Sequence, residues 1–110
     1  MDTKLDTIAA TLFGVPVESL YIRSLKRSIT LPRQVCMTIR HKIYHQRLWQ
    51  VKNKYGLRNH ATLIHGRKTV QGMYMSSKEF RSKLNTLLAE LDIDLSMAIE
   101  EIGLKGGANG

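Results

Sequence analysis

The stretch of sequence that decides the fold is residues 48–70, LWQVKNKYGLRNHATLIHGRKTV. It predicts a short helix over 48–55, a turn at Gly56 and a second helix capped by Asn59. Glycine suits the turn because it enters the left-handed conformation at little cost, and asparagine is a favoured N-cap. The stretch therefore predicts a helix-turn-helix, although an ordinary helical hairpin with a solvated polar face fits the same pattern.

The second predicted helix has an apolar face and a polar face. Leu63, Gly66, Val70 and Met73 recur at helical spacing and are expected to be buried. In a helix-turn-helix, the N-terminal residues of the second helix meet base edges in the DNA major groove. The predicted base contacts are Asn59, His60, Ala61, Thr62 and Ile64.

The charge pattern around this stretch indicates a polyanionic partner. The 110-residue chain has a net charge of +8, and no Asp or Glu lies between Ser19 and Lys78. Thirteen of the seventeen Lys and Arg residues lie in that span. Nucleic acid is the favoured polyanion. An anionic membrane surface is the competing partner, but the basic residues are spread over several predicted helices rather than gathered on one amphipathic helix.

The rest of the chain predicts an all-α fold, a compact bundle of five to six helices that contains the helix-turn-helix. Further helices are expected over residues 3–13, 32–45, 76–91 and 95–102, besides a short helical segment over 17–21. Thr3 with Asp6 and Ser76 with Glu79 resemble capping boxes. The basic segment 23–28 is expected to be an exposed loop. For Trp49 the sequence leaves two roles open, a core position, which is preferred, and a base-stacking one. The single cysteine, Cys36, is assigned to the core.

Enzymatic and metal-binding functions find little support in the residues. His41 and His45 are one helical turn apart, but no third ligand is evident, so two solvated histidines are the preferred interpretation. Nucleophilic triads and paired-carboxylate sites need an acid, which residues 19–78 lack. We expect no enzyme, no cofactor and no metal. Without a signal peptide or a transmembrane stretch, the expected location is the cytoplasm, in association with the nucleoid.

Two motifs at a matching separation make a family resemblance specific. The run SITLPRQVCM at residues 28–37 and the run YGLRNHATLIH at residues 55–65 resemble the C-terminal DNA-binding domain of the bacterial replication initiator DnaA, a TrpR-like helix-turn-helix domain. That family shows Pro-Arg-Gln-x-x-Met and then Gly-x-Arg-Asp-His-Thr-Thr-Val-x-His. The resemblance spans roughly residues 8–91, and it implies an all-α module with its signature helix in the major groove and a basic loop in the minor groove.

The resemblance also supplies expected DNA-backbone contacts. By their places in the two motifs, these are Arg33, Gln34, Arg58 and His65. Basic residues of the loop and of the outer helix faces are expected to contact the backbone as well. The predicted backbone contacts are Lys26, Arg27, Arg33, Gln34, His41, Arg58, His65, Arg67 and Lys68.

Three positions depart from the family pattern. Asn59 replaces the family acid, Ala61 replaces its first threonine, and Leu25 stands where the loop arginine is expected. Asparagine both donates and accepts, which favours adenine, whereas a carboxylate accepts from cytosine. The chain has no Gly-x-x-x-x-Gly-Lys-Ser/Thr loop, so the nucleotide-hydrolysing module of the initiator is not expected.

We therefore expect a stand-alone domain over residues 1–91, an additional C-terminal helix over 92–105 and a disordered tail over 106–110. Its expected partner is double-stranded DNA, bound by a monomer without a membrane. The alternative is a protein-interaction module on the same fold, which would use the helix at 95–102 or Trp49 and keep only non-specific DNA affinity. RNA is a weaker alternative, because A-form duplexes hide their major groove.

Overall fold

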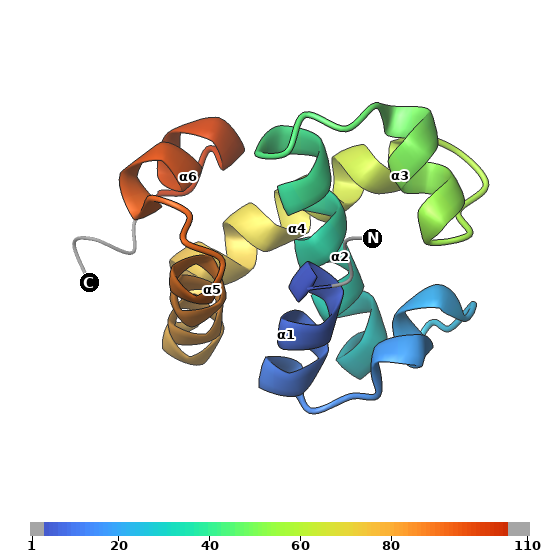
Figure 1. Ribbon diagram of the computed structural model, residues 1–110, viewed down its shortest axis with the longest axis horizontal. Helices are drawn as coiled ribbons and strands as arrows, with labels where there is room; N and C mark the ends of the chain where they lie inside the picture. The colour runs from blue at the N-terminus through green and yellow to red at the C-terminus, as the bar shows by residue number, and fades with distance from the viewer. Residues whose placement is uncertain (1–3, 106–110) are drawn as a thin grey trace.

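Six α-helices and one 3₁₀ helix make up the part of the chain that the computed structural model describes, residues 4–105 (Figure 1). They are α1 (Lys4–Phe13), η1 (Val17–Tyr21), α2 (Arg27–Lys42), α3 (Leu48–Lys54), α4 (Ala61–Ser76), α5 (Lys78–Glu90) and α6 (Leu95–Ile102). Within the described residues there is no strand, and the all-α prediction is confirmed. The predicted tail, 106–110, and Thr3 lie outside them.

Helices α2 and α4 cross at the centre of the fold (Figure 1). Val35 and Ile39 from α2 and Leu63 and Val70 from α4 are buried there. Gly66 lies at the crossing, where an added Cβ would be 3.2 Å from Cγ of Gln34. A small residue at this position therefore lets the second helix of the helix-turn-helix lie close against α2.

The remaining helices cover the other sides of this crossing. Helix α1 packs against α2 and α5, and the rings of Phe13 and Phe80 are 5.9 Å apart between centroids. Helix α6 packs against α2 and α5 through the buried Ala98 and Ile102. The additional C-terminal helix thus shares the core of the other helices. No helix among residues 4–105 is both long and apolar enough to cross a bilayer.

The bounds of α2 differ from the prediction at both ends. The helix begins at Arg27, so Pro32 lies in its second turn instead of opening it. Its first turn is closed by the carbonyl of Lys26, which accepts from the backbone N–H groups of Ile29 and Thr30. The helix ends at Lys42, and His45 adopts a left-handed φ of 58°. His41 and His45 are therefore not on one helical turn.

Two predicted caps, of α4 and of α5, are wrong. Helix α4 begins at Ala61 with His60 at the N-cap, so Asn59 is not the cap. Ser77, not Ser76, caps α5, because its hydroxyl accepts from the backbone N–H of Phe80. The predicted box of Thr3 with Asp6 stays a prediction, because Thr3 lies outside the described residues. The carboxylate of Asp6 itself is buried and accepts from side chains of other helical elements.

Two predicted core positions are also corrected. Trp49, for which a core position is preferred from sequence, is 54% exposed, because it lies on the outer side of α3, whereas Val51 is the buried residue of that helix. On α4 the fourth buried position is Tyr74, and Met73 is only half-buried.

Candidate nucleic-acid interface

The turn between α3 and α4 is fixed by its own backbone hydrogen bonds. Gly56 has a φ of 66°, the left-handed conformation predicted for it. The N–H of Leu57 donates to the carbonyl of Lys52 at 2.9 Å, and the N–H of Gly56 donates to that of Asn53 at 3.3 Å. This pairing is the Schellman motif, which satisfies the free carbonyls at a helix end. The end of α3 and the direction of the following chain are therefore set locally.

A buried acid ties this turn to the rest of the fold. The carboxylate of Asp6, on α1, accepts from the hydroxyls of Tyr55 and Tyr21, each at 2.5 Å, and from Nη2 of Arg40 at 3.1 Å. Nε of Arg40 also donates to the Tyr55 hydroxyl at 2.8 Å. Lys54 adds an ion pair to the same carboxylate at 3.6 Å. Because Tyr55 is the C-cap of α3, this cluster positions the helix-turn-helix against α1 and α2.

Burial changes the acid–base behaviour of this cluster. Desolvation raises the pKa of the Tyr55 hydroxyl well above its ordinary value, and the neighbouring Cys36 and Asp6 raise it further. Desolvation also raises the pKa of Tyr21, helped by its hydrogen bond to Asp6. The tyrosines therefore stay protonated and donate to the carboxylate. The buried Cys36 thiol likewise has a raised pKa through desolvation, so it remains a thiol in the core.

The segment between η1 and α2, residues 22–26, forms an exposed basic loop held by one arginine. Nε of Arg33 donates to the carbonyl of Leu20 at 2.9 Å, and Nη2 donates to that of Ile22 at 2.6 Å. Nη1 lies 3.5 Å from the carbonyl of Ser24. Arg33, which the sequence predicts as a DNA-backbone contact, is only 7% exposed and is buried under the basic loop. Its guanidinium organises the basic loop from beneath, and desolvation lowers its pKa.

The basic loop and the start of α4 flank one hollow of about 380 Å³. Arg23, Ser24 and Leu25 line it from the basic loop, and Leu57, Arg58 and Thr62 line it from the turn and α4. Gln34 and Met37 of α2 line it between these two sides. We call it the loop–helix hollow. In Figure 1 the basic loop and the α3–α4 turn lie on the same side of the molecule, away from α5 and α6.

Most predicted base contacts lie accessible at the N-terminal end of α4. Asn59, His60 and Ala61 are exposed, and Ile64, one turn further on, is 56% exposed. Thr62 is half-buried and lines the loop–helix hollow. The structure thus brings this predicted set together on one short segment.

The predicted backbone contacts divide into two groups. Lys26, Arg58, His65 and Lys68 are exposed, and Gln34 lines the loop–helix hollow. Arg27, Arg33 and Arg67 make hydrogen bonds elsewhere in the fold. Nε of Arg67 donates to the carbonyl of Ile102 at the end of α6 at 3.1 Å.

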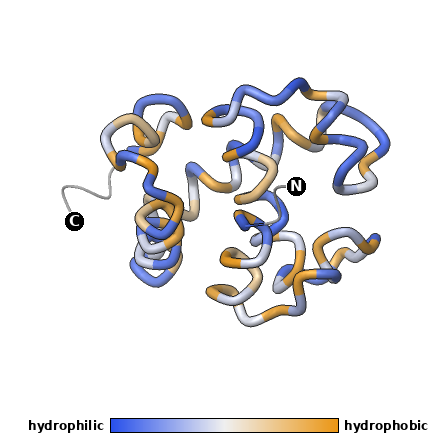
Figure 2. Tube along the Cα trace, viewed as in Figure 1, coloured by the Kyte–Doolittle hydropathy of each residue, from blue (hydrophilic) through white to orange (hydrophobic). Residues whose placement is uncertain are grey.

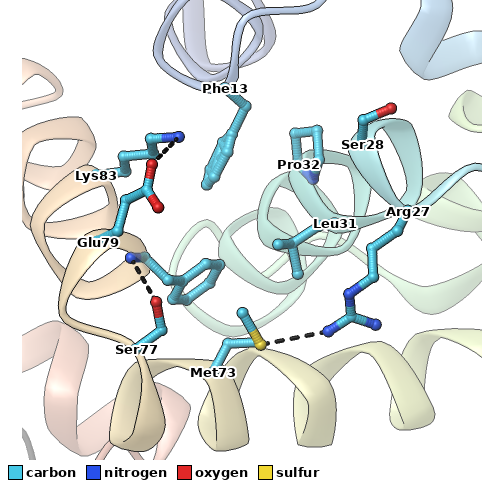
Figure 3. A pocket seen from close by; sticks show the side chains of 10 residues that line it. Phe13, Arg27, Ser28, Leu31, Pro32, Met73, Ser77, Glu79 and Lys83 are labelled. Atoms are coloured by element: carbon cyan, nitrogen blue, oxygen red, sulfur yellow. Dashed lines mark hydrogen bonds and ion pairs between the residues drawn. The ribbon is translucent and has the colours of Figure 1, made fainter.

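Arg27 belongs to this second group, whereas His41, on α2, is only partly accessible. Arg27 is exposed, but its Nη2 lies 3.3 Å from Sδ of Met73, and it borders an apolar pocket of about 190 Å³ (Figure 3). Figure 3 shows Phe13, Leu31 and Pro32 around that pocket, and no residue that lines it also lines the loop–helix hollow. His41 is half-buried, and desolvation, helped by nearby Lys42 and Arg67, lowers its pKa.

Charge is segregated along the fold. Apart from Asp6, which is buried, and Glu18 in η1, the acids of the described residues lie on α5, on α6 or between them. Figure 2 shows that α3 and the α3–α4 turn are mostly hydrophilic, and no acid occurs in this part of the chain. The face that carries the loop–helix hollow is therefore cationic.

Sequence reasoning left Arg23, Leu25, Met37 and Leu57 out of the candidate site, although all four line the loop–helix hollow. Arg23 has a signal in the sequence, since it opens the basic segment. The other three are apolar, and their place beside the hollow follows only from how the basic loop and the α3–α4 turn are packed.

Comparison with known proteins finds relatives of this chain. Residues 4–70 match the family described as bacterial dnaA protein helix-turn-helix. The chain is 31% identical over 78 residues to the chromosomal replication initiator protein DnaA of Wolbachia sp. subsp. Brugia malayi (strain TRS), covering 71% of this chain and 17% of that protein. It is 35% identical over 82 residues to that of Desulfotalea psychrophila (strain LSv54 / DSM 12343), covering 74% and 17%. The chain thus spans about a sixth of the length of these relatives.

Proposed function

Because the chain belongs to the family of bacterial DnaA helix-turn-helix domains, we propose that it binds double-stranded DNA with the N-terminal end of α4 in the major groove. The basic loop then lies on the adjacent backbone or in the minor groove. Membership of this family supports DNA binding in general. The groove assignments, the contact residues and any role in starting replication are proposals for this chain.

The loop–helix hollow is the observation that carries the proposal. Arg23 and Arg58 stand on its two sides, and the acid-free span 19–78 contains every residue that lines it. A major groove about 12 Å wide admits one helix, and the adjoining groove begins one sugar–phosphate strand away. The loop–helix hollow can therefore receive one sugar–phosphate strand. The start of α4 then faces the groove on one side of that strand, and the basic loop faces the groove on the other side.

Roles follow from where each side chain lies. Asn59, His60 and Ile64 are exposed at the start of α4, where side chains read bases. Arg58, Lys26 and Lys68 are exposed cations suited to phosphates, which position the protein without reading sequence. Arg33 acts through the basic loop that it holds and not by touching DNA.

The salt dependence of binding tests this function. Fluorescence anisotropy with a mixed-sequence duplex should give a log–log slope of affinity against salt of about −4 to −7, as expected for roughly five to eight phosphate contacts. Arg58→Ala should make the slope shallower by about 1. Lys105→Ala removes the same charge from the end near α6, where Lys105 is exposed, and should leave the slope unchanged. A slope near zero, or no binding at low salt, would refute duplex binding.

A protein-interaction module on the same fold is the second candidate, favoured by the exposed Trp49 on α3 and Leu95 and Met97 on α6. Selection of bound sites from random DNA separates the two functions. A base-reading α4 should yield a clear consensus, whereas a module with only non-specific affinity should yield none. We place the DNA-bound protein in the cytoplasm, at the nucleoid.

A further inference from the structure

The tip of the basic loop presents an apolar side chain to solvent. Leu25 is 96% exposed, and its neighbours Arg23 and Lys26 are exposed cations. Ile22, at the start of the same loop, is also exposed. A single exposed leucine is ordinary on a protein surface. Leu25 differs from such a residue in two ways: hydrogen bonds hold the backbone of its loop, and cations flank it beside the loop–helix hollow.

The support is the rigid backbone beneath it. Arg33 binds the carbonyls of Leu20, Ile22 and Ser24, that is, alternate residues leading up to Leu25. On the other side, the hydroxyl of Ser24 accepts from the backbone N–H of Lys26 at 3.2 Å. Helix α2 then begins at once with Arg27. Leu25 is therefore projected by a loop that is ordered before any partner arrives.

The surroundings identify the partner. Leu25 lines the loop–helix hollow opposite Arg58 and Thr62. When α4 enters a major groove, a loop across one backbone strand reaches the adjacent minor groove. The cations on both sides of Leu25 match the phosphates that border that groove, and no acid lies in this part of the chain to oppose them.

We propose that Leu25 is an apolar wedge that enters the minor groove and partly unstacks one base step, so that binding bends the duplex. The proposal rests on the proposed duplex binding. Apolar wedges of this kind kink DNA by about 20–90°, toward the major groove. Pyrimidine–purine steps unstack most easily, so the wedge adds a preference for such a step without any hydrogen bond to a base.

Ring closure of short DNA measures the bend without knowledge of the target site. A mixed-sequence fragment of about 100 base pairs is shorter than the persistence length of about 150 base pairs and rarely closes by itself. At saturating protein, with occupancy fixed by anisotropy, the wild type should raise the yield of ligated monomer circles by about ten-fold. Leu25→Ala should bring the yield back to that of free DNA while lowering affinity by less than about ten-fold.

Two further variants make the result specific. Met75→Ala also removes an exposed apolar side chain, 55% exposed, but from the far end of α4, about 20 Å along the helix from Ala61. It should close rings as well as the wild type. Arg33→Lys keeps the charge but cannot bind three carbonyls in a fork, so it should lower the circle yield although Leu25 is present.

Each outcome decides between the proposals. Binding without extra circles, or undiminished circles with Leu25→Ala, would overturn the wedge and leave duplex binding standing. No binding at low salt would remove both. Co-sedimentation with phosphatidylserine-containing vesicles is the second measurement. If Leu25→Ala lowers vesicle binding and leaves the circle yield unchanged, the loop is a lipid anchor and the wedge is wrong.

Discussion

Removal of the buried carboxylate by Asp6→Ala should destabilise the protein more than any surface change. The side chains of Asp6 and Arg40 are 0% and 2% exposed, and the carboxylate accepts from Arg40 and from two tyrosine hydroxyls. Loss of one partner from a buried pair costs about 3–5 kcal/mol, because the other charge stays buried without its counter-ion. Arg40 keeps its bond to Tyr55, which limits the loss to this range.

Urea denaturation followed by circular dichroism measures this cost. A chain of this size has a total stability of about 5–15 kcal/mol, so the variant should lose a large part of it and unfold at a much lower midpoint. Asp94→Ala is the matched control, because it removes an acid that only caps α6 through the N–H of Met97 and should cost about 0.5–2 kcal/mol.

The same substitution links stability to function. Asp6 holds Tyr55, and Tyr55 precedes the turn into α4, so DNA affinity should fall even at temperatures where the variant remains folded. If Asp6→Ala costs no more than Asp94→Ala, the buried cluster does not stabilise the fold as argued. If the folded variant binds DNA like the wild type, the cluster does not position the α3–α4 turn.

Four other substitutions probe separate parts of the molecule. Gly103→Ala should cost about 1–2 kcal/mol in urea denaturation without changing DNA affinity, because φ is 86° there and the added Cβ would lie 2.8 Å from Nε2 of Gln71. Tyr55 has a raised pKa in the fold, so the stability that it contributes is complete below its unfolded pKa of about 10 and falls as pH rises above that value. Tyr55→Phe should therefore be less stable at neutral pH and lose less stability above pH 10; an unchanged alkaline slope would contradict the raised pKa. His60→Ala should weaken a selected site by roughly 1–3 kcal/mol more than random DNA, whereas Arg58→Ala should weaken both alike; equal losses for His60→Ala on both DNAs would mean that α4 does not read sequence.

Local pattern was enough to place the helices and the turn of the helix-turn-helix. The apolar spacing of Leu63, Gly66 and Val70 predicted the buried face of α4, and Gly56 takes the left-handed conformation expected of it. These features depend on residues within one or two turns of each other, so the sequence carries them directly. The motif at 55–65 likewise led to the correct family.

Local patterns could not predict the side chains whose hydrogen-bond partners lie far away in the sequence. Arg33 looks like a surface cation in a helix, and only the packing of η1 beside α2 shows that it binds three loop carbonyls. Asp6 fits a helix N-terminus by its spacing, but its partners come from η1, α2 and the end of α3. Trp49 is apolar by type, yet its position on α3 leaves it exposed.

The sequence by itself determined the helical class, the family and a cationic face without acids, since composition and periodicity are properties of the chain alone. The tertiary structure decided which cations are free for DNA and which are committed to the fold. It also decided that Leu25 stands beside the start of α4, 36 positions later in the chain. The physical reason is that a buried polar group must find its partners wherever packing brings them, and those partners lie far away in sequence.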